Sequence, residues 1–241
     1  MKRSFCICML VVLAVLLLPM TVLAADQGMG FSVSFRTDEE VEQFARSHDN
    51  VTLFFEEPEK MPIACFSVNQ SGWYALGFET SPKRIVSVYN VAGEFICGYE
   101  FESSGTFAIA LSDEGNLSIY YCRSDLIVTY SPDGQCLYVA DVPGTSENRK
   151  RSYEVLNSGN CLEIGDRTYF LDREIDIGSD YSRLVLRYPN GEEVILYDAT
   201  SSNNWKRFLN VTYILGIFGF AFYMLGKELL KHIREDGTLG I

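Results

Sequence analysis

The fold is decided by two stretches of similar design, IVSVYNVAGEFICGYEF at residues 85–101 and LIVTYSPDGQCLYVADV at residues 126–142. In each stretch an apolar run rich in β-branched and aromatic residues leads to an X-Gly pair, and a second apolar run follows. Such runs favour strands, and a glycine between them supplies the positive φ that a hairpin turn requires. Both stretches therefore predict antiparallel hairpins, which turn at Gly93 and Gly134.

Hairpins of two kinds alternate along the chain, and the first kind recurs after 43 and then 44 residues. Two hairpins per period make a four-stranded unit the size of a propeller blade, and such units bury their apolar faces by stacking. We therefore predict an all-β domain at residues 63–200, with about three antiparallel four-stranded units in a partial or open propeller. The turns are expected at Gly72, Gly115 and Gly159 for the first kind, and at Gly93, Gly134 and Gly191 for the second, with an insertion in the third unit.

The stretches 85–101 and 126–142 resemble the strand–turn–strand signature of NHL-type and related bacterial β-propeller repeats. GTFAIALSDEGNLSIYY at residues 105–121 resembles the preceding hairpin of the same repeat, and the resemblance covers about Ile63 to Thr200. It implies a scaffold that binds proteins or small ligands, since only some of these propellers are enzymes. Closed propellers have four to eight blades. Closure would need a divergent extra blade or a partner chain, and the alternative is an open stack without a central ligand channel.

The segment before the repeats, residues 25–62, has a different pattern. Residues 31–35 and 51–55 alternate like strands, and residues 39–45 between them favour a short helix. Thr37 or Asp38 is suited to cap that helix, and acidic residues in its first turn complement the helix dipole. Its apolar face is expected to dock on a sheet.

Both ends of the chain are strongly apolar. Residues 1–24 have the basic start, apolar run and small-residue site of a signal peptide, and an uncleaved anchor is the alternative. Residues 208–226 have the length and composition of a transmembrane helix, after a polar linker at 201–207. Basic residues are more numerous in the tail, 227–241, than before the helix. We therefore predict a single-pass protein of the cell membrane, with its main domain extracytoplasmic and its C-terminus cytoplasmic.

The composition excludes one class of partner. The chain carries 32 Asp and Glu against 20 Lys and Arg, a net charge of −12, and most of this acidity lies between residues 26 and 203. Nucleic acids are recognised through basic patches, so we expect no nucleic-acid partner. The expected partners are the membrane and another protein or a second copy, because the terminal sheets of an open stack leave edges and faces exposed.

No catalytic set and no cofactor-binding motif is recognisable. His48 falls at the expected end of the short helix, where a cation is favoured electrostatically. Five cysteines of the main domain lie in apolar runs without a CxxC pair, so we interpret them as small apolar residues, with one or two disulfides left open. The acidic residues that could form a metal site are Asp172, Glu174, Asp176 and Asp180. The aromatic residues that could form the rim of a ligand site are Trp73, Tyr74, Tyr120 and Tyr121.

These patterns favour a membrane-tethered extracytoplasmic β-repeat module for protein or ligand binding or scaffolding. One alternative is an extracytoplasmic hydrolase that uses paired carboxylates, such as Glu56 with Glu57 or Glu192 with Glu193. Another alternative is a sensor that signals through the tail at 227–241.

Overall fold

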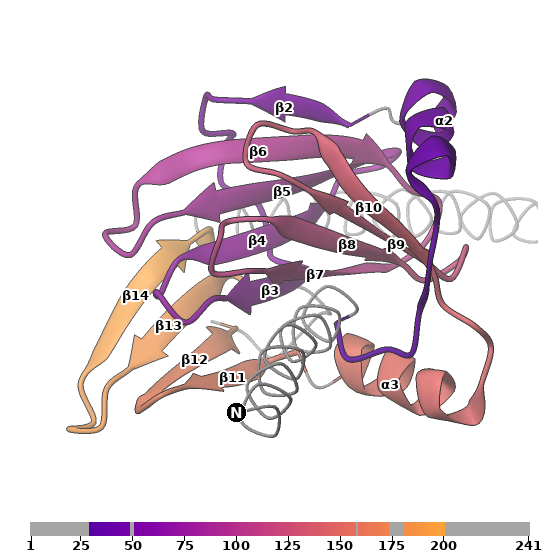
Figure 1. Ribbon diagram of the computed structural model, residues 1–241. Coiled ribbons are helices and arrows are strands. Elements are labelled where there is room, and N and C mark those ends of the chain that lie inside the picture. The colour runs from indigo at the N-terminus through magenta and orange to yellow at the C-terminus, as the bar shows by residue number, and fades with distance from the viewer. Residues whose placement is uncertain (1–28, 49–50, 158, 174–180, 201–241) are drawn as a thin grey trace, which may run out of the picture. The chain divides into compact units, whose positions relative to one another are not determined.

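The computed structural model describes residues 29–48, 51–157, 159–173 and 181–200. The first of its two compact units ends at Asp198 and contains all the described strands. They form three antiparallel sheets (Figure 1). The all-β, propeller-like repeat predicted from the hairpin pattern is confirmed.

The first sheet has five strands in the order β2-β6-β5-β4-β3. Its four consecutive strands follow one another through hairpins, and β2 adds antiparallel to β6 at the outer edge. The bounds are β2 (Thr52–Phe54), β3 (Cys65–Val68), β4 (Tyr74–Glu79), β5 (Lys83–Tyr89) and β6 (Phe95–Glu102).

The second sheet repeats this plan in the order β1-β10-β9-β8-β7. Here β1 adds antiparallel to β10, again at the outer edge. The bounds are β1 (Ser34–Phe35), β7 (Phe107–Leu111), β8 (Leu117–Tyr121), β9 (Leu126–Tyr130) and β10 (Cys136–Asp141).

The third sheet has four strands in the order β11-β12-β13-β14. They are β11 (Cys161–Ile164), β12 (Arg167–Asp172), β13 (Arg183–Arg187) and β14 (Glu193–Asp198). A helix, α3 (Ser146–Asn157), precedes this sheet. This helix lies in the connection between the second and third units and was not revealed by the sequence pattern. The insertion expected within the third unit, between Cys161 and Arg183, lies partly outside the described residues.

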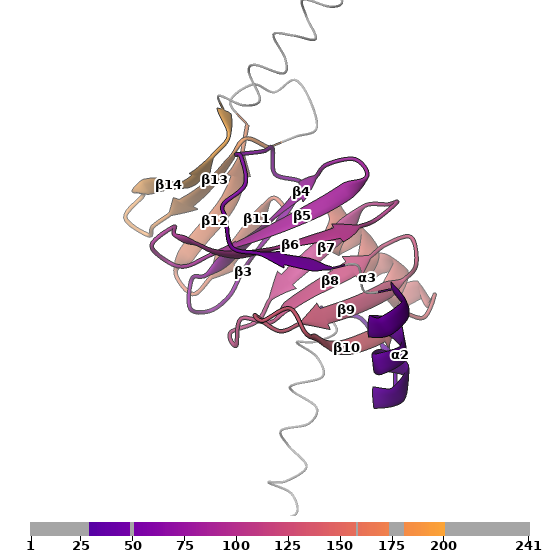
Figure 2. The ribbon, with the colours of Figure 1, turned by 90° about the horizontal axis from the view of Figure 1, so that it is seen from above.

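The first sheet lies between the other two, as Figure 2 shows. One face of it contributes Val86, Tyr99 and neighbouring residues to a core shared with the second sheet. From the opposite face Tyr74 donates a hydrogen bond of 3.1 Å to the backbone carbonyl of Leu196 in β14. Strand β4 is accordingly buried on both faces from Tyr74 to Phe78. The spatial order of the units is thus third, first, second, because α3 and the N-terminal segment occupy the outer face of the second sheet.

Helix α2 (Asp38–His48) begins as the sequence indicates. The backbone N–H of Thr37 donates to the Glu40 carboxylate at 2.8 Å, and the N–H of Glu40 donates to the Thr37 hydroxyl at 3.4 Å. This reciprocal pair is a capping box, which identifies Thr37 as the N-cap. Val41 and Phe44 pack against the core between the first two sheets. The predicted docking of the apolar helix face is confirmed.

Five hairpins share one turn geometry. In the first of them the N–H of Gly72 donates to the carbonyl of Asn69, and the N–H of Asn69 donates to the carbonyl of Trp73, each at 3.0 Å. This pattern is a three-residue loop that ends in a left-handed residue. The glycines at 72, 93, 115, 134 and 191 take φ values between +80° and +85°, so five of the six predicted turn positions are confirmed.

The sixth position is wrong. Gly159 lies between α3 and β11, whereas the hairpin from β11 to β12 turns at Gly165, where φ is +62°. Ile164 pairs directly with Arg167, so this loop has only two residues. The 43-residue spacing that pointed to Gly159 is interrupted by the inserted helix.

The fold-class prediction needs two further corrections. Two units are five-stranded rather than four-stranded, because β1 and β2 come from the segment that precedes the repeats. The predicted class also included a transmembrane helix, but no helix in the described part of the chain is long and apolar enough to cross a membrane. Helices α2 and α3 have 11 and 12 residues, only about 17–18 Å at 1.5 Å per residue. The predicted signal peptide, linker, membrane helix and tail (1–24, 201–207, 208–226 and 227–241) lie outside the described residues.

Candidate functional site

One cavity among the described residues lies where the first strands of all three units meet. Strands β3, β7 and β11 are each the inner edge of their sheet, and together with α3 they line a cavity of about 500 Å3. We call it the inner-strand pocket. Its apolar wall consists of Phe66 and Val68 from β3, Ile109 and Leu111 from β7, and Leu162 and Ile164 from β11.

The inner strands of the first two units are joined by polar contacts between equivalent positions of the repeat. The Ser67 hydroxyl accepts a hydrogen bond of 3.0 Å from the N–H of Leu111. The Asn69 amide donates to the carbonyl of Ser112 at 3.0 Å. These partners are 44 and 43 residues apart, which is the spacing of the repeat itself. Equivalent positions of two repeats therefore join the inner strands β3 and β7, which form one wall of the pocket.

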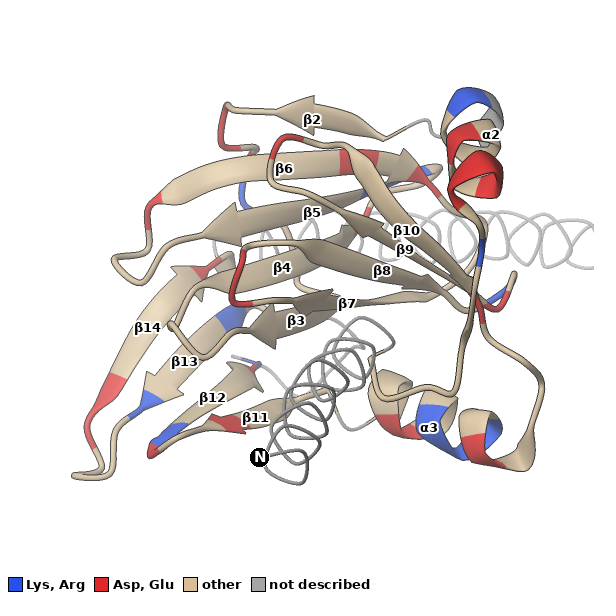
Figure 3. Ribbon diagram, in the orientation of Figure 1, with Lys and Arg blue, Asp and Glu red and all other residues tan. Residues whose placement is uncertain are grey.

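Helix α3 supplies the polar groups of the inner-strand pocket. The Arg151 guanidinium donates to the backbone carbonyl of Met29 at 3.0 Å and lies 3.5 Å from the Glu154 carboxylate. Both side chains line the pocket and are partly exposed. Figure 3 shows that α3 carries charges of both signs on its turns. The cavity thus combines an apolar wall with one cation and one carboxylate.

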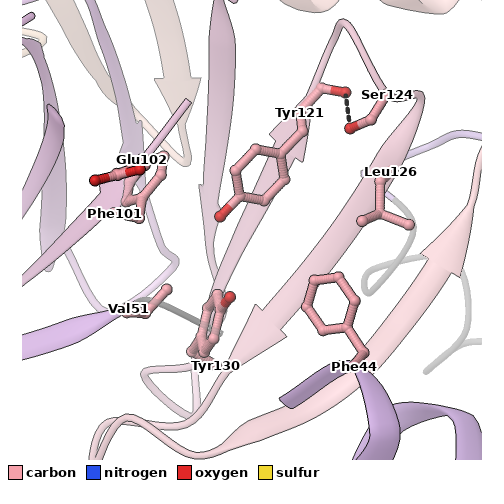
Figure 4. Close-up of a pocket in the computed structure, with 8 residues that line it drawn as sticks. All are labelled: Phe44, Val51, Phe101, Glu102, Tyr121, Ser124, Leu126 and Tyr130. Carbon is pink, nitrogen blue, oxygen red and sulfur yellow. Dashed lines mark hydrogen bonds between the residues drawn. The ribbon is translucent and has the colours of Figure 1, made fainter. Parts of the chain in front are cut away.

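A second cavity, of about 240 Å3, lies between the first two sheets beside α2 (Figure 4). We call it the aromatic pocket, because four rings line it: Phe44 of α2, Phe101 of β6, Tyr121 of β8 and Tyr130 of β9. The rings of Phe101 and Tyr121 are 5.6 Å apart between centroids and nearly perpendicular, at 77°. The other lining residues are Val51, Glu102, Ser124 and Leu126.

The aromatic residues predicted to form a ligand rim are divided by the structure. Tyr74 and Tyr120 are buried in the core, with 0% and 1% of their surface exposed. Trp73 is half-buried against the core of the first two sheets. Tyr121 lines the aromatic pocket. The alternation of side chains along the strands predicted that at least half of these four rings are structural. It did not predict that Tyr121 lines a pocket between two sheets.

The metal candidates are not brought together within the described residues. Asp172 ends β12 and pairs in register with Arg183 of β13, whereas Glu174, Asp176 and Asp180 lie outside the described residues. Among the described residues no group of three His, Cys, Asp or Glu side chains is placed to hold a metal ion. The metal site from residues 172–180 stays an untested prediction.

The paired carboxylates considered for hydrolysis have structural partners. Glu57 accepts a hydrogen bond of 3.2 Å from the Tyr89 hydroxyl, and Glu193 forms an ion pair of 2.7 Å with Arg187. Tyr89 lies beside Tyr197, and burial raises the pKa of Tyr197 to about 12. A phenol with such a pKa stays protonated near neutrality and donates hydrogen bonds. Glu57 and Glu193 thus take part in ordinary contacts that hold sheets and strands together.

The five cysteines of the described region are free thiols. Cys97 is buried, Cys161 is exposed, and the other three (Cys65, Cys122 and Cys136) are half-buried. Burial raises the pKa of the Cys122 thiol to about 11. The interpretation of these cysteines as small apolar residues fits four positions and fails at Cys161, which lies on the edge strand β11.

Sequence comparison adds no family assignment, since no protein-family model and no curated protein matches the chain. Among solved structures, a streptogramin B lyase aligns at 13% identity over 62% of this chain and 45% of its own, with a TM-score of 0.26. A catalytically inactive virginiamycin B lyase from Staphylococcus aureus with quinupristin aligns at 10% identity over 63% of this chain and 60% of its own, with a TM-score of 0.25. The chain therefore spans about half the length of these proteins, and the similarity is too low to carry a functional argument.

Most residues that line the two pockets carry no sequence signal of that role. Arg151 and Glu154 belong to a helix that interrupts the repeat, so no periodic pattern marked them. Phe44 was recognised as a docking residue, but its partners Phe101 and Tyr130 lie far away in the sequence. A usable signal was the Arg-Glu spacing of three on a helix, which brings the two side chains to one face.

Proposed function

We propose that this chain is a binding or scaffolding module built of β-sheet repeats, with the inner-strand pocket as its ligand site. The observation that carries the proposal is the convergence of β3, β7 and β11 on one cavity. Its volume, about 500 Å3, lies within the range of about 300–1,000 Å3 found for small-molecule sites. Its lining combines apolar side chains of the three inner strands with the charged groups of α3, and such sites fix a ligand through a few placed polar groups.

The lining specifies the kind of ligand. An apolar body would contact the side chains of the inner strands, and an anionic group would lie near the Arg151 guanidinium. Glu154 lies beside that guanidinium, so ligand binding has to compete with an existing ion pair. We therefore expect modest selectivity for anions and a strong dependence of affinity on the apolar area of the ligand.

Titration of the purified full chain with the apolar anion 8-anilinonaphthalene-1-sulfonate tests the proposal. Ala110 is a partly exposed pocket residue of β7, so Ala110→Trp should fill the cavity and abolish most of the dye fluorescence. Ala92→Trp, at the exposed turn between β5 and β6, is the matched control and should bind the dye as the natural chain does. Equal dye binding by the Ala110→Trp variant, with an unchanged circular dichroism spectrum, would refute the pocket as the site.

The repeat family and the cellular location of the chain are also our proposals. The attribution to NHL-type repeats is supported by the stretches 85–101, 105–121 and 126–142. The extracytoplasmic location at the cell membrane is supported by the signal-peptide pattern of residues 1–24. Fractionation of cells, followed by detection with an antibody to the domain, would test it. The hydrolase alternative gains no support from the described carboxylate pairs, and the sensor alternative depends on a tail outside the described residues.

A further inference from the structure

The aromatic pocket has the composition of a cation-binding cage. Four rings from α2, β6, β8 and β9 surround one small cavity, and in Figure 4 Phe44 lies on the opposite side of the gap from Phe101. The face of an aromatic ring carries negative electrostatic potential, and it attracts a cation within about 6 Å of its centroid. Phe101 and Tyr121, being nearly perpendicular, form two adjoining walls of the cavity.

We propose that the aromatic pocket binds a quaternary ammonium group, as in choline and its derivatives. This proposal concerns a site other than the inner-strand pocket and does not depend on it. The methyl groups of the ligand would contact Val51 and Leu126 as well as the rings. The positive charge would lie among the ring faces, with the Glu102 carboxylate as the acidic group among the lining residues.

The charges around the cavity favour a cation. No Lys or Arg is among its lining residues, whereas Glu102 supplies a negative charge at the rim. The Arg36 guanidinium carbon lies 6.0 Å from the centre of the Phe44 ring, so this ring already interacts with one cation. The charge of Arg36 is engaged by Asp141, at 2.7 Å, and Lys83, which lies opposite Glu102 in the register of β5 and β6, is bonded to Glu100.

The cost of desolvating N–H donors favours a methylated ammonium over a primary amine. A primary ammonium carries three N–H donors that all need partners once they leave water. The acceptors that line the cavity are the Glu102 carboxylate and the hydroxyls of Ser124, Tyr121 and Tyr130, and a primary amine would have to reach three of these oxygens at once. A quaternary ammonium has no N–H to satisfy. The volume of about 240 Å3 restricts the ligand to a small headgroup.

Isothermal titration of the purified full chain with choline tests the proposal, and 3,3-dimethyl-1-butanol serves as the neutral ligand of the same shape. Choline should bind at least roughly tenfold more tightly, because only the cation gains from the ring faces. Phosphocholine as a third ligand distinguishes a free choline site from a headgroup site. Binding of choline or of phosphocholine supports recognition of a quaternary ammonium group. Equal affinity for choline and its neutral analogue, or no binding of either cation, would overturn the proposal.

Variants connect the binding to the cage. Tyr121→Leu should weaken choline binding by roughly tenfold, whereas Tyr121→Phe, which keeps the ring, should retain it. Phe44→Leu is the second cage variant, in case the first does not fold. Tyr153 is 70% exposed on α3, so Tyr153→Leu is the matched control and should bind as the natural chain does. Folded Tyr121→Leu and Phe44→Leu variants with full affinity would refute the assignment.

Discussion

Replacing Asn148 by alanine should destabilise the domain more than an alanine substitution at any exposed position of the same helix. Asn148 lies at the start of α3 and is 4% exposed. Its amide nitrogen donates to the carbonyls of Ser32 and Pro143, both at 2.8 Å, and its amide oxygen accepts from the N–H of Ser32 at 2.9 Å. One side chain thus attaches the N-terminal segment to the inserted helix, and both cover the second sheet.

The magnitude follows from these three hydrogen bonds. A buried hydrogen bond contributes about 1 kcal/mol net, so Asn148→Ala should lower the free energy of unfolding by about 3 kcal/mol. For a domain of this size the melting temperature should fall by about 6–12 °C. Asn148→Asp should be equally harmful at neutral pH, because its carboxylate would face two carbonyl oxygens, and protonation at low pH should restore part of the loss.

Urea unfolding followed by circular dichroism measures the effect. Asn157 is the matched control, since its exposed amide makes one hydrogen bond to the Tyr153 carbonyl. Asn157→Ala should change the free energy of unfolding by less than about 0.5 kcal/mol. A loss below about 1 kcal/mol in Asn148→Ala would mean that water replaces the amide, and the reasoning from buried hydrogen bonds would then be wrong.

Arg36 donates to both carboxylate oxygens of Asp141 and holds the pKa of that carboxyl below its usual value. This ion pair should contribute less than about 1 kcal/mol, because both side chains are partly exposed. The contribution is present above the pKa of Asp141 in the unfolded chain, about 3.9, and is lost as the pH falls through its lowered pKa in the folded chain. Asp141→Asn should remove this acid-dependent decline in urea midpoints measured from pH 5 to pH 2, and an identical decline would contradict the assignment. Gly98→Ala should lower the melting temperature, because its Cβ would lie 2.0 Å from Phe54, and Phe54→Leu in the same chain should restore part of the loss. Cys161, as the exposed thiol, should react first with a maleimide in native protein, and mass spectrometry of peptides would show whether another described cysteine precedes it.

The sequence by itself determined the hairpins. The stretches 85–101 and 126–142 form β5-β6 and β9-β10, and the glycines at their turns have the expected positive φ. The start of α2 was also predicted, with Thr37 as one of two expected caps, and the structure decides for Thr37. These features depend on residues within a few positions of one another, so local backbone preference and side-chain alternation are sufficient to specify them.

Only the tertiary structure decided which strands complete the sheets and which side chains line the cavities. Strand β1 pairs with β10 more than 100 residues away, and no local pattern specifies such a partner. The spatial order of the units, third, first, second, was decided by tertiary packing as well, since α3 and the N-terminal segment cover the outer face of the second sheet. Alternation places Phe101 and Tyr121 on apolar faces, but the packing of whole sheets decides which faces meet and where a gap between them remains.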